Sequence, residues 1–280
     1  MTHNKFLKTV LGVLNVGGIW LLALLFLFPF FWMISNAIRP SNEIFLYPPS
    51  VFPKTWQWEN FSIAWNKLPF ARYFFNSLLV SVGILAIFAT VSIGAAYSFS
   101  RLRWKGREVV LIAYLSTLMI PQMMLMIPQF LTINMFGWIN TYAGLIVPVA
   151  FGSFGVFLLR QFFLQVPNEL EESAKIDGAS AFRRLVDVVL PLSLPAVGLI
   201  ALFNFIYTWS GFLWPLIVAS DTEHTTLPVG LTLFQDDQGS DWNFIMAGAA
   251  FSMIPGVILA IALQKYIYNG ISANTGFGGR

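Results

Sequence analysis

Five long stretches of this 280-residue chain contain no aspartate, glutamate, lysine or arginine. They occupy residues 9–38, 73–100, 109–159, 188–220 and 242–264. A helix needs about 20 apolar residues to cross the hydrocarbon core of a bilayer, so four of the stretches have room for one span each. The stretch 109–159 has room for two, with Asn134, Gly137 and Asn140 favouring a turn near its middle. The pattern predicts six membrane-spanning helices.

We therefore expect an all-α membrane protein in which residues 1–280 form one transmembrane domain. The expected spans are about 13–37, 73–99, 109–131, 140–161, 194–218 and 244–268. Charged residues make up only 10% of the chain, against about 25% in soluble domains. The first apolar stretch is longer than a signal-peptide core and has no small-residue cleavage site after it, which favours a retained helix. The absence of cysteine excludes disulfides and thiolate metal sites.

The distribution of basic residues predicts the orientation. With a cytoplasmic N-terminus, six spans place 12 lysine and arginine residues on the cytoplasmic side and 4 outside. The outside set is Arg39, Lys54, Lys67 and Arg72. Short cytoplasmic loops carry an excess of positive charge, so we expect both termini to be cytoplasmic. The net charge of +3 follows from this asymmetry and does not indicate nucleic-acid binding.

The longest loop on the expected cytoplasmic side, about 162–192, is predicted to contain two short helices. Asn168 is placed to cap the first, with Glu171 three residues later as in a capping box. Gly178 suits the left-handed residue that ends a helix. Ser180 is placed to cap the second helix, which stops at Pro191. The result is a compact helical hairpin between the fourth and fifth spans.

This loop resembles the permease subunits of ATP-binding cassette (ABC) importers. Their loop carries the pattern E-A-A, three residues, G, nine residues, I, one residue, L-P. The corresponding residues here are Glu172-Ser173-Ala174, Gly178, Val188 and Leu190-Pro191, so serine replaces alanine and valine replaces isoleucine. The stretches beginning at Tyr142, Phe157 and Tyr207 are similar to carbohydrate-type permeases. The resemblance covers roughly residues 70–270.

The resemblance implies that the chain is a transport permease and not an enzyme. It implies that residues 169–179 dock on a separate ATPase subunit. The docking residues implied in this way are Glu171, Glu172, Ser173, Ala174, Asp177, Gly178, Ala179, Leu190 and Pro191. The implied assembly has two ATPases, a second related permease or a second copy of this chain, and an extracytoplasmic solute-binding protein. Its location would be the plasma membrane, the inner membrane of a bacterium or the corresponding membrane of an archaeon.

No G-x-x-x-x-G-K-[ST] phosphate loop occurs in the chain, so we expect it not to bind ATP by itself. ATP and magnesium are expected in the partner subunits, and no cofactor or metal is expected in this chain. His224 is expected to be a solvated loop residue.

Two glutamines on the third expected span, Gln122 and Gln129, are seven residues apart and share one helix face. Polar groups inside a span usually face the protein interior. The two side chains could bind sugar hydroxyls, or they could join helices and satisfy carbonyls freed by the neighbouring prolines.

On the fifth expected span, Asn204, Tyr207, Gly211 and Trp214 recur at spacings of three and four, which places them on one stripe. Rings and an amide suit a sugar, whose C–H faces stack on aromatic rings while its hydroxyls bind amides. Tyr207 and Trp214 fit an aromatic belt at the membrane interface equally well.

An acidic external loop precedes the last span. Its candidate contacts with the binding protein are Gln235, Asp236, Asp237, Gln238 and Asp241. In some sugar importers this loop reaches the ligand cleft of the binding protein, and a solvated acidic loop explains the same residues.

Two other functions fit a six-span chain. An ion-coupled secondary transporter would carry ionisable residues within its spans, and these spans have no Asp, Glu, Lys or Arg apart from Arg160 and Lys265 near their ends. A membrane scaffold without transport activity would not need the docking pattern.

Overall fold

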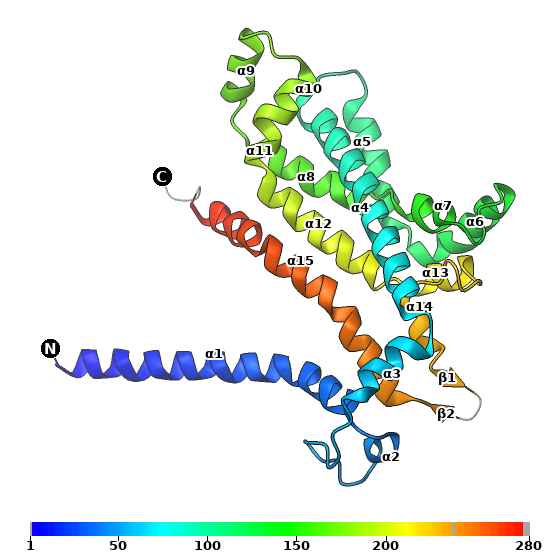
Figure 1. Cartoon of the computed structure of the whole chain (residues 1–280). Coiled ribbons are helices and arrows are strands. Elements are labelled where there is room, and N and C mark those ends of the chain that lie inside the picture. The colour runs from blue at the N-terminus through cyan, green and yellow to red at the C-terminus, as the bar shows by residue number, and fades with distance from the viewer. Residues whose placement is uncertain (1, 237–238, 277–280) are drawn as a thin grey trace. The chain divides into compact units, whose positions relative to one another are not determined.

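The computed structural model describes the backbone of residues 2–236 and 239–276 and the side chains of residues 16–235 and 241–264. In that part of the chain the structure is helical except for two paired two-residue strands (Figure 1). The α-helices, with a π-helical turn η3 and two 3₁₀ turns, are α1 Thr2–Ala37, α2 Ser41–Ile44, α3 Glu59–Lys67, α4 Phe70–Arg101, α5 Arg107–Ser116, η1 Thr117–Met119, α6 Gln122–Met135, α7 Tyr142–Ile146, η2 Val147–Val149, α8 Ser153–Gln165, α9 Asn168–Ile176, α10 Ala181–Arg184, η3 Leu185–Val189, α11 Leu190–Leu192, α12 Leu194–Trp209, α13 Leu213–Val218, α14 Leu227–Thr232 and α15 Trp242–Gly276. The strands are β1 Gln235–Asp236 and β2 Gly239–Ser240.

Three helices are long and apolar enough to cross a membrane unaided: Val16–Ala37, Phe70–Arg101 and Trp242–Gln264. Three further candidates are bent pairs of helices. The pairs are Arg107–Met119 with Gln122–Met135 at 100°, Tyr142–Val149 with Ser153–Gln165 at 48°, and Ala181–Leu192 with Leu194–Trp209 at 81°. The predicted number of six is reached when each bent pair is one span.

The bends differ from the continuous helices expected from the sequence. The helix expected at 109–131 breaks at Ile120, which has an extended backbone because Pro121 follows it. The helix expected at 194–218 ends at Trp209, and α13 starts only at Leu213. Charge-free length predicts how many times the chain crosses the membrane, but it carries no information about local interruptions.

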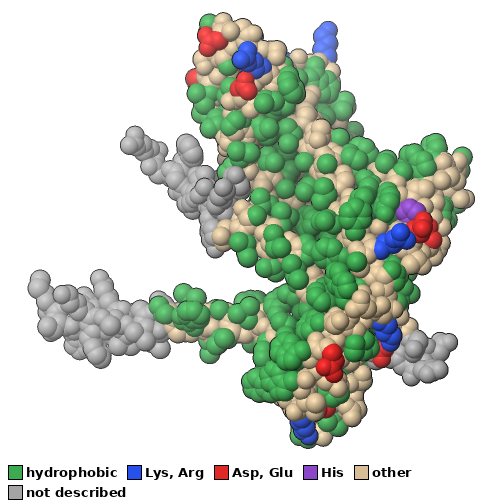
Figure 2. Space-filling view, in the orientation of Figure 1, with side chains coloured by type: hydrophobic (Ala, Val, Ile, Leu, Met, Phe, Trp, Pro, Cys, Tyr) green, Lys and Arg blue, Asp and Glu red, His purple; other side chains and the backbone are tan. Residues whose placement is uncertain are grey.

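The described chain forms two compact units. The smaller unit comprises Met1–Phe70 and Leu231–Met253, and the main unit comprises Ala71–Gly230 and Ile254–Arg280. Figure 2 shows hydrophobic side chains over most of the visible face of the main unit, with charged side chains gathered near α9 at one end and near α7 and α13 at the other. This is the surface expected of helices that meet lipid.

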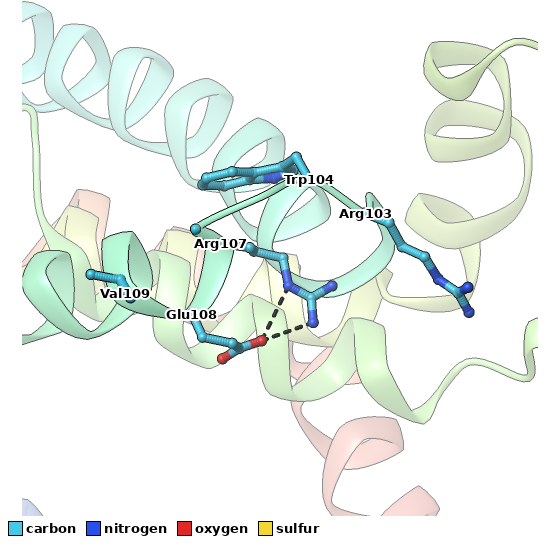
Figure 3. Close-up of a pocket in the computed structure, with 6 residues that line it drawn as sticks. Arg103, Trp104, Arg107, Glu108 and Val109 are labelled. Atoms are coloured by element: carbon cyan, nitrogen blue, oxygen red, sulfur yellow. Dashed lines mark hydrogen bonds and ion pairs between the residues drawn. The ribbon is translucent and has the colours of Figure 1, made fainter.

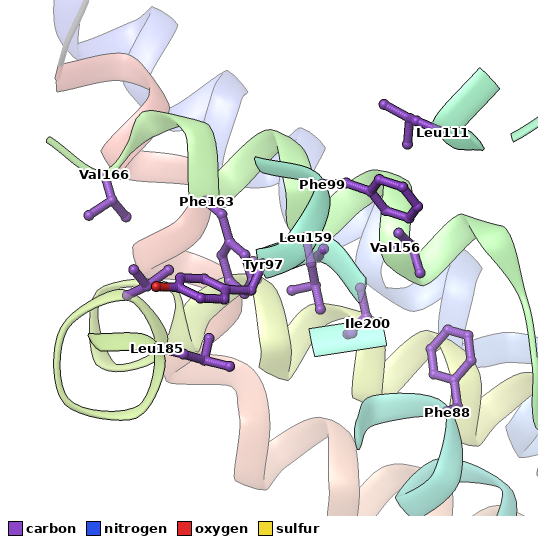
Figure 4. Close-up of a cluster of buried hydrophobic side chains, with 13 residues drawn as sticks. Phe88, Tyr97, Phe99, Leu111, Val156, Leu159, Phe163, Val166, Leu185 and Ile200 are labelled. Atoms are coloured by element: carbon purple, nitrogen blue, oxygen red, sulfur yellow. The ribbon is translucent and has the colours of Figure 1, made fainter. Parts of the chain in front are cut away.

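The core of the main unit lies between α4, α8, η3 and α12 (Figure 4). Phe88, Leu159, Phe163 and Ile200 are among its buried members. Helices α4 and α8 approach closely at Gly155, where an added Cβ would lie 2.5 Å from the Phe88 ring. Small residues at such crossings let helix backbones pack tightly in lipid.

In the smaller unit, polar groups fasten the end of α1 to the segment that follows it. The buried Arg39 guanidinium donates to Ser35 Oγ at 3.0 Å and to the carbonyls of Ser50 and Val51 at 2.6 and 3.0 Å. Asn60 donates to the carbonyls of Ala37 and Arg39, both at 2.9 Å. The two Asn60 bonds satisfy carbonyls that the end of a helix leaves free.

Candidate functional site

The segment after α8 folds into two short helices joined at Gly178. Gly178 has φ 83°, the left-handed conformation predicted for it. The amide of Ala179 donates to the Ala174 carbonyl at 2.9 Å, which closes the end of α9 in the way typical of a glycine stop. The Ser180 hydroxyl accepts the Arg183 amide at 3.3 Å, so the predicted cap of the second helix is confirmed.

The predicted cap of the first helix is wrong. Asn168 is already the first helical residue, Pro167 precedes it, and no side chain caps the helix. The Asn168 side-chain oxygen instead accepts from Arg101, which also donates to the carbonyls of Phe163 and Val166. Arg101, at the end of α4, therefore binds the Asn168 side-chain oxygen that a capping box would use to accept a backbone amide.

Glu171 lies at the centre of a buried polar cluster. Its Oε1 accepts from the Tyr97 hydroxyl at 2.8 Å, and its Oε2 lies 3.2 Å from Arg101 Nε. Arg184 Nε lies 3.7 Å from Oε1. One carboxylate thus joins α9 to the end of α4 and to α10. Removing one member of such a buried set leaves the others charged and unpaired, so the cluster holds α9 in one position.

The opposite face of α9 is open. Glu172, Ser173, Asp177 and Gly178 are exposed, and Ala174 and Ala179 are half-buried. Apolar side chains lie beside them without cover: Ile176 is 86% exposed, Phe182 74% and Leu170 44%. An exposed apolar patch with a polar rim is typical of a protein contact surface.

Beyond α10 the chain continues without a loop into the membrane-spanning part. The π-helical turn η3 leads to α11, where Leu190 packs against the core and Pro191 is exposed. An 81° bend separates the helix ending at Leu192 from α12. The hairpin of α9 and α10 and the helix α12 are therefore one continuous backbone with a break at Ser193.

A cavity of about 440 Å³ lies between α4, α6, α12 and α13. A second cavity of about 570 Å³ shares Gln122, Val149, Ile206 and Tyr207 with it, so the two are contiguous. All six candidate path residues line one or both cavities: Gln122, Gln129, Asn204, Tyr207, Gly211 and Trp214. The structure therefore brings α6 together with α12, α13 and the connection between them, about 80 positions away in the sequence.

The polar groups of these cavities differ in what they already bind. Gln129 donates to the Pro148 carbonyl at 3.4 Å, and Trp214 is buried with its indole N–H on the Gly144 carbonyl at 3.2 Å. The Asn204 side-chain oxygen is buried and has no hydrogen-bond partner within the described residues. Tyr207 is 65% exposed. Asn204 and Tyr207 therefore retain binding capacity that Gln129 and Trp214 have used.

The loop predicted to be external is described only in part. Gln235 is exposed, Asp236 is described only as backbone in β1, and Asp237 and Gln238 lie outside the described residues. Asp241 pairs with Lys67, whose ammonium lies 5.1 Å above the Phe244 ring. The structure thus gives Asp241 a partner within its own unit.

His224 is not a solvated loop residue, as the sequence suggested. Its side chain is 19% exposed, its Nδ1 lies 2.9 Å from Asp221 Oδ2, and its ring lies 4.8 Å from that of Tyr142. The Tyr142 hydroxyl donates to Asn76 at 2.7 Å, and Asn76 donates to the carbonyls of Glu223 and Thr225. A spatial cluster of this kind leaves no periodic signal in the sequence.

Several residues of both sites were missed by sequence reasoning. Tyr97, Arg101 and Arg184 hold α9, and the rings of Phe88, Phe151, Phe154 and Phe203 line the second cavity. The arginines belong to basic clusters that are visible in the sequence, but the sequence does not show that Arg101 and Arg184 pair with Glu171. The phenylalanines cannot be told from lipid-facing residues by composition alone.

The sequence between residues 86 and 273 matches the family described as binding-protein-dependent transport system inner membrane component. This chain belongs to that family. The matched region contains α9, Gly178 and the six candidate path residues. The chain is therefore a multi-pass membrane permease of a binding-protein-dependent transport system.

Two relatives extend the similarity over nearly the whole permease. This chain is 36% identical over 276 residues to the trehalose/maltose transport system permease protein MalG of Thermococcus litoralis, and the alignment covers 97% of this chain and 98% of the relative. It is 34% identical over 264 residues to the probable ABC transporter permease protein YurM of Bacillus subtilis, covering 92% and 87%.

The fold is shared with a solved structure. A chain of a bacterial ABC transporter involved in the import of the acidic polysaccharide alginate superimposes with a TM-score of 0.80, covering 92% of the permease and 97% of that chain at 23% identity.

Proposed function

We propose that this permease is one membrane subunit of an ATP-driven ABC importer and that, with a second permease, it forms the path for a sugar or sugar-like solute. The observation that carries the proposal is the pair of contiguous cavities, because all the polar path residues converge there. The trehalose/maltose specificity in the name of its relative supports the same class of solute.

The lining of the second cavity suits a carbohydrate. Five aromatic rings line it: Phe88, Phe151, Phe154, Phe203 and Tyr207. Gln122 and Asn204 add amide groups. Sugars present apolar C–H faces that stack on rings, and hydroxyls that bind amides, so a few oriented polar groups in an apolar pocket match their chemistry. The unbound oxygen of Asn204 is the group we assign to a solute hydroxyl.

The exposed face of α9 is the proposed dock for an ATPase subunit. Glu172, Ser173 and Gly178 lie on that face, with Ile176 and Phe182 supplying apolar contact area. ATP and magnesium would be bound by the two ATPases, and this chain would hold no cofactor. The same assembly requires the second permease, either a related chain or a second copy.

Alternating access follows from the way α9 is attached. When ATP closes the ATPase pair, movement of the docked hairpin passes through Glu171 to α4 and through η3 and the 81° bend to α12. Both helices line the cavities, so the cavity opens outward to receive solute from the extracytoplasmic binding protein. Hydrolysis then restores the inward-facing state. Both termini and the hairpin lie in the cytoplasm in this scheme, and Gln235 and Asp241 face the binding protein.

Co-purification tests the assembly. The tagged chain, extracted in mild detergent from its native membrane, is expected to carry an ATPase and a second permease that mass spectrometry identifies. Isolation of the intact chain alone would instead favour an ion-coupled carrier or a scaffold.

Solute uptake tests the cavity. Tyr207→Ala is expected to lower uptake of the solute by about fivefold, since one aromatic stacking partner contributes on the order of 1 kcal/mol. Phe26→Ala is the matched control, because this ring on α1 is 74% exposed and lies outside both cavities. Equal uptake by the two variants would contradict the proposed path.

A further inference from the structure

The short connection between α4 and α5 forms an open cavity of about 520 Å³ that shares no lining residue with the two cavities of the proposed path (Figure 3). Its lining residues are Arg103, Trp104, Gly106, Arg107, Glu108 and Val109. Gly106 has φ 84°, so the chain turns sharply there and presents these side chains around one opening.

The lining residues Arg103, Arg107 and Glu108 give the cavity a net charge of +1, and Lys105, which does not line it, lies between Trp104 and Gly106 in the same turn. Its one carboxylate, Glu108, is held by Arg107 at 2.8 Å and by Arg160 at 3.9 Å. Arg103 and Lys105 are exposed, and neither has an ion pair or hydrogen bond from its side chain in the described part of the chain. Figure 3 shows Arg103 extending away from the Arg107–Glu108 pair, with its guanidinium free. Two cations are therefore available to an anion.

This charge lies where an apolar helix ends. The membrane-spanning helix α4 stops at Arg101, two residues before Arg103. The exposed apolar face of α5 begins at the cavity, with the lining residue Val109 and with Ile112, which are 72% and 67% exposed. Within two helical turns the surface changes from cationic to fully apolar.

Trp104 marks the same boundary. Its indole N–H donates to Ser98 Oγ at 3.2 Å, and its ring lies 5.8 Å from that of Phe99. The ring is held in place yet remains 39% exposed. Tryptophan is enriched at the headgroup level of bilayers because one end of the ring is apolar and the other is polar. The cavity therefore lies at headgroup depth on whichever side of the membrane it faces.

We propose that this cavity binds the headgroup of an anionic phospholipid. Arg103 and Lys105 take the phosphate, to which a guanidinium can donate two parallel hydrogen bonds. The acyl chains lie along Val109 and Ile112. A free phosphate ion would use the cations but not the apolar face beneath them. Basic pockets at the ends of membrane helices bind acidic lipids for the same electrostatic reason. The inference is independent of the transported solute and of the direction of transport.

The test uses the full chain, with whatever subunits co-purify, in nanodiscs of equal parts phosphatidylglycerol and phosphatidylcholine. Native mass spectrometry counts the phosphatidylglycerol molecules that stay bound to the protein after it is released from the nanodiscs. The variant Arg103→Gln/Lys105→Gln is expected to lose affinity for phosphatidylglycerol by about tenfold to thirtyfold, since each cation near an anionic headgroup contributes about 1 kcal/mol. Arg103→Lys/Lys105→Arg keeps both charges and is expected to restore retention.

Lys54→Gln/Arg72→Gln removes the same number of exposed charges outside the cavity and is the matched control. Equal retention by the cavity variant and this control would overturn the proposal. Complete competition by millimolar inorganic phosphate would also overturn it, by assigning the site to a soluble anion. Retention that appears only after the other subunits are removed would identify the surface as a protein interface and would overturn the lipid assignment as well.

Discussion

Arg101 and Glu171 form an ion pair between the end of α4 and α9, with 3.2 Å between Nε and Oε2 and side chains only 6% and 11% exposed. The two residues are 70 positions apart in the sequence. Since α4 lines the cavity and α9 carries the proposed ATPase dock, this pair connects the two parts that move together in the proposed transport cycle.

Glu171→Ala is expected to release α9. The change leaves Arg101 and Arg184 buried without their carboxylate, and breaking a buried pair in this way costs about 3–5 kcal/mol. Hydrogen exchange of the amides in 168–176 is expected to accelerate by two orders of magnitude or more. Glu172→Ala is the control, because Glu172 is exposed and lies outside the cluster. Similar exchange in the two variants would show that Glu171 does not hold the helix.

Gly178→Val is expected to reduce ATPase attachment while leaving membrane insertion intact. A Cβ at Gly178 meets no atom within 4 Å, so the penalty comes from its φ of 83° alone. Left-handed backbone costs a non-glycine residue about 1–2 kcal/mol. Gly178→Asn is the control, since asparagine tolerates this conformation. Recovery of the ATPase by affinity purification measures the effect, and equal recovery with valine and asparagine would count against the docking role.

Asn204→Leu is expected to separate stability from transport. Its buried oxygen has no partner within the described residues, and an unsatisfied buried acceptor costs about 1–3 kcal/mol. Leucine has a similar volume, so the melting temperature should stay the same or rise, while solute uptake falls. Asn66→Leu on the surface of α3 provides the control for uptake. Loss of stability together with uptake would mean that Asn204 is structural.

The loop around Asp221 is expected to loosen at low pH. Burial acts to raise the pKa of Asp221, but hydrogen bonds from the His224 ring and amide and from the Glu223 backbone outweigh it, and the pKa lies below its ordinary value of 3.8. A carboxylate with a depressed pKa in the folded state stabilises the protein above the unfolded pKa. That stabilisation is lost as the pH falls through the folded pKa, which places the change below about pH 4.

The chain has no cysteine, so a single Thr222→Cys substitution allows a fluorescent probe to be placed on this loop. Its anisotropy is expected to fall on acidification below about pH 4. The second substitution Asp221→Asn should remove this pH dependence. A transition that persists in the double variant would assign the change to another group.

The sequence by itself determined the features that depend on local chemistry. The number of spans follows from the absence of charge, because each buried charge in lipid costs several kcal/mol wherever it lies. The stop at Gly178 and the cap at Ser180 follow from the backbone and hydroxyl of single residues, and both are present. The shared face of Gln122 and Gln129 follows from helical spacing alone, and both line one cavity.

Only the tertiary structure decided which partner each polar group found. Glu171 was expected to cap its own helix and instead binds Tyr97 and two arginines, while Asn168 accepts from Arg101. Trp214 fitted an aromatic belt by composition, yet its indole is buried on the Gly144 carbonyl. A hydrogen-bond donor can pair with any one of several chemically similar acceptors. Which acceptor it binds depends on which helices pack together. That packing brings together residues about 60 to 80 positions apart, and no local periodicity records it.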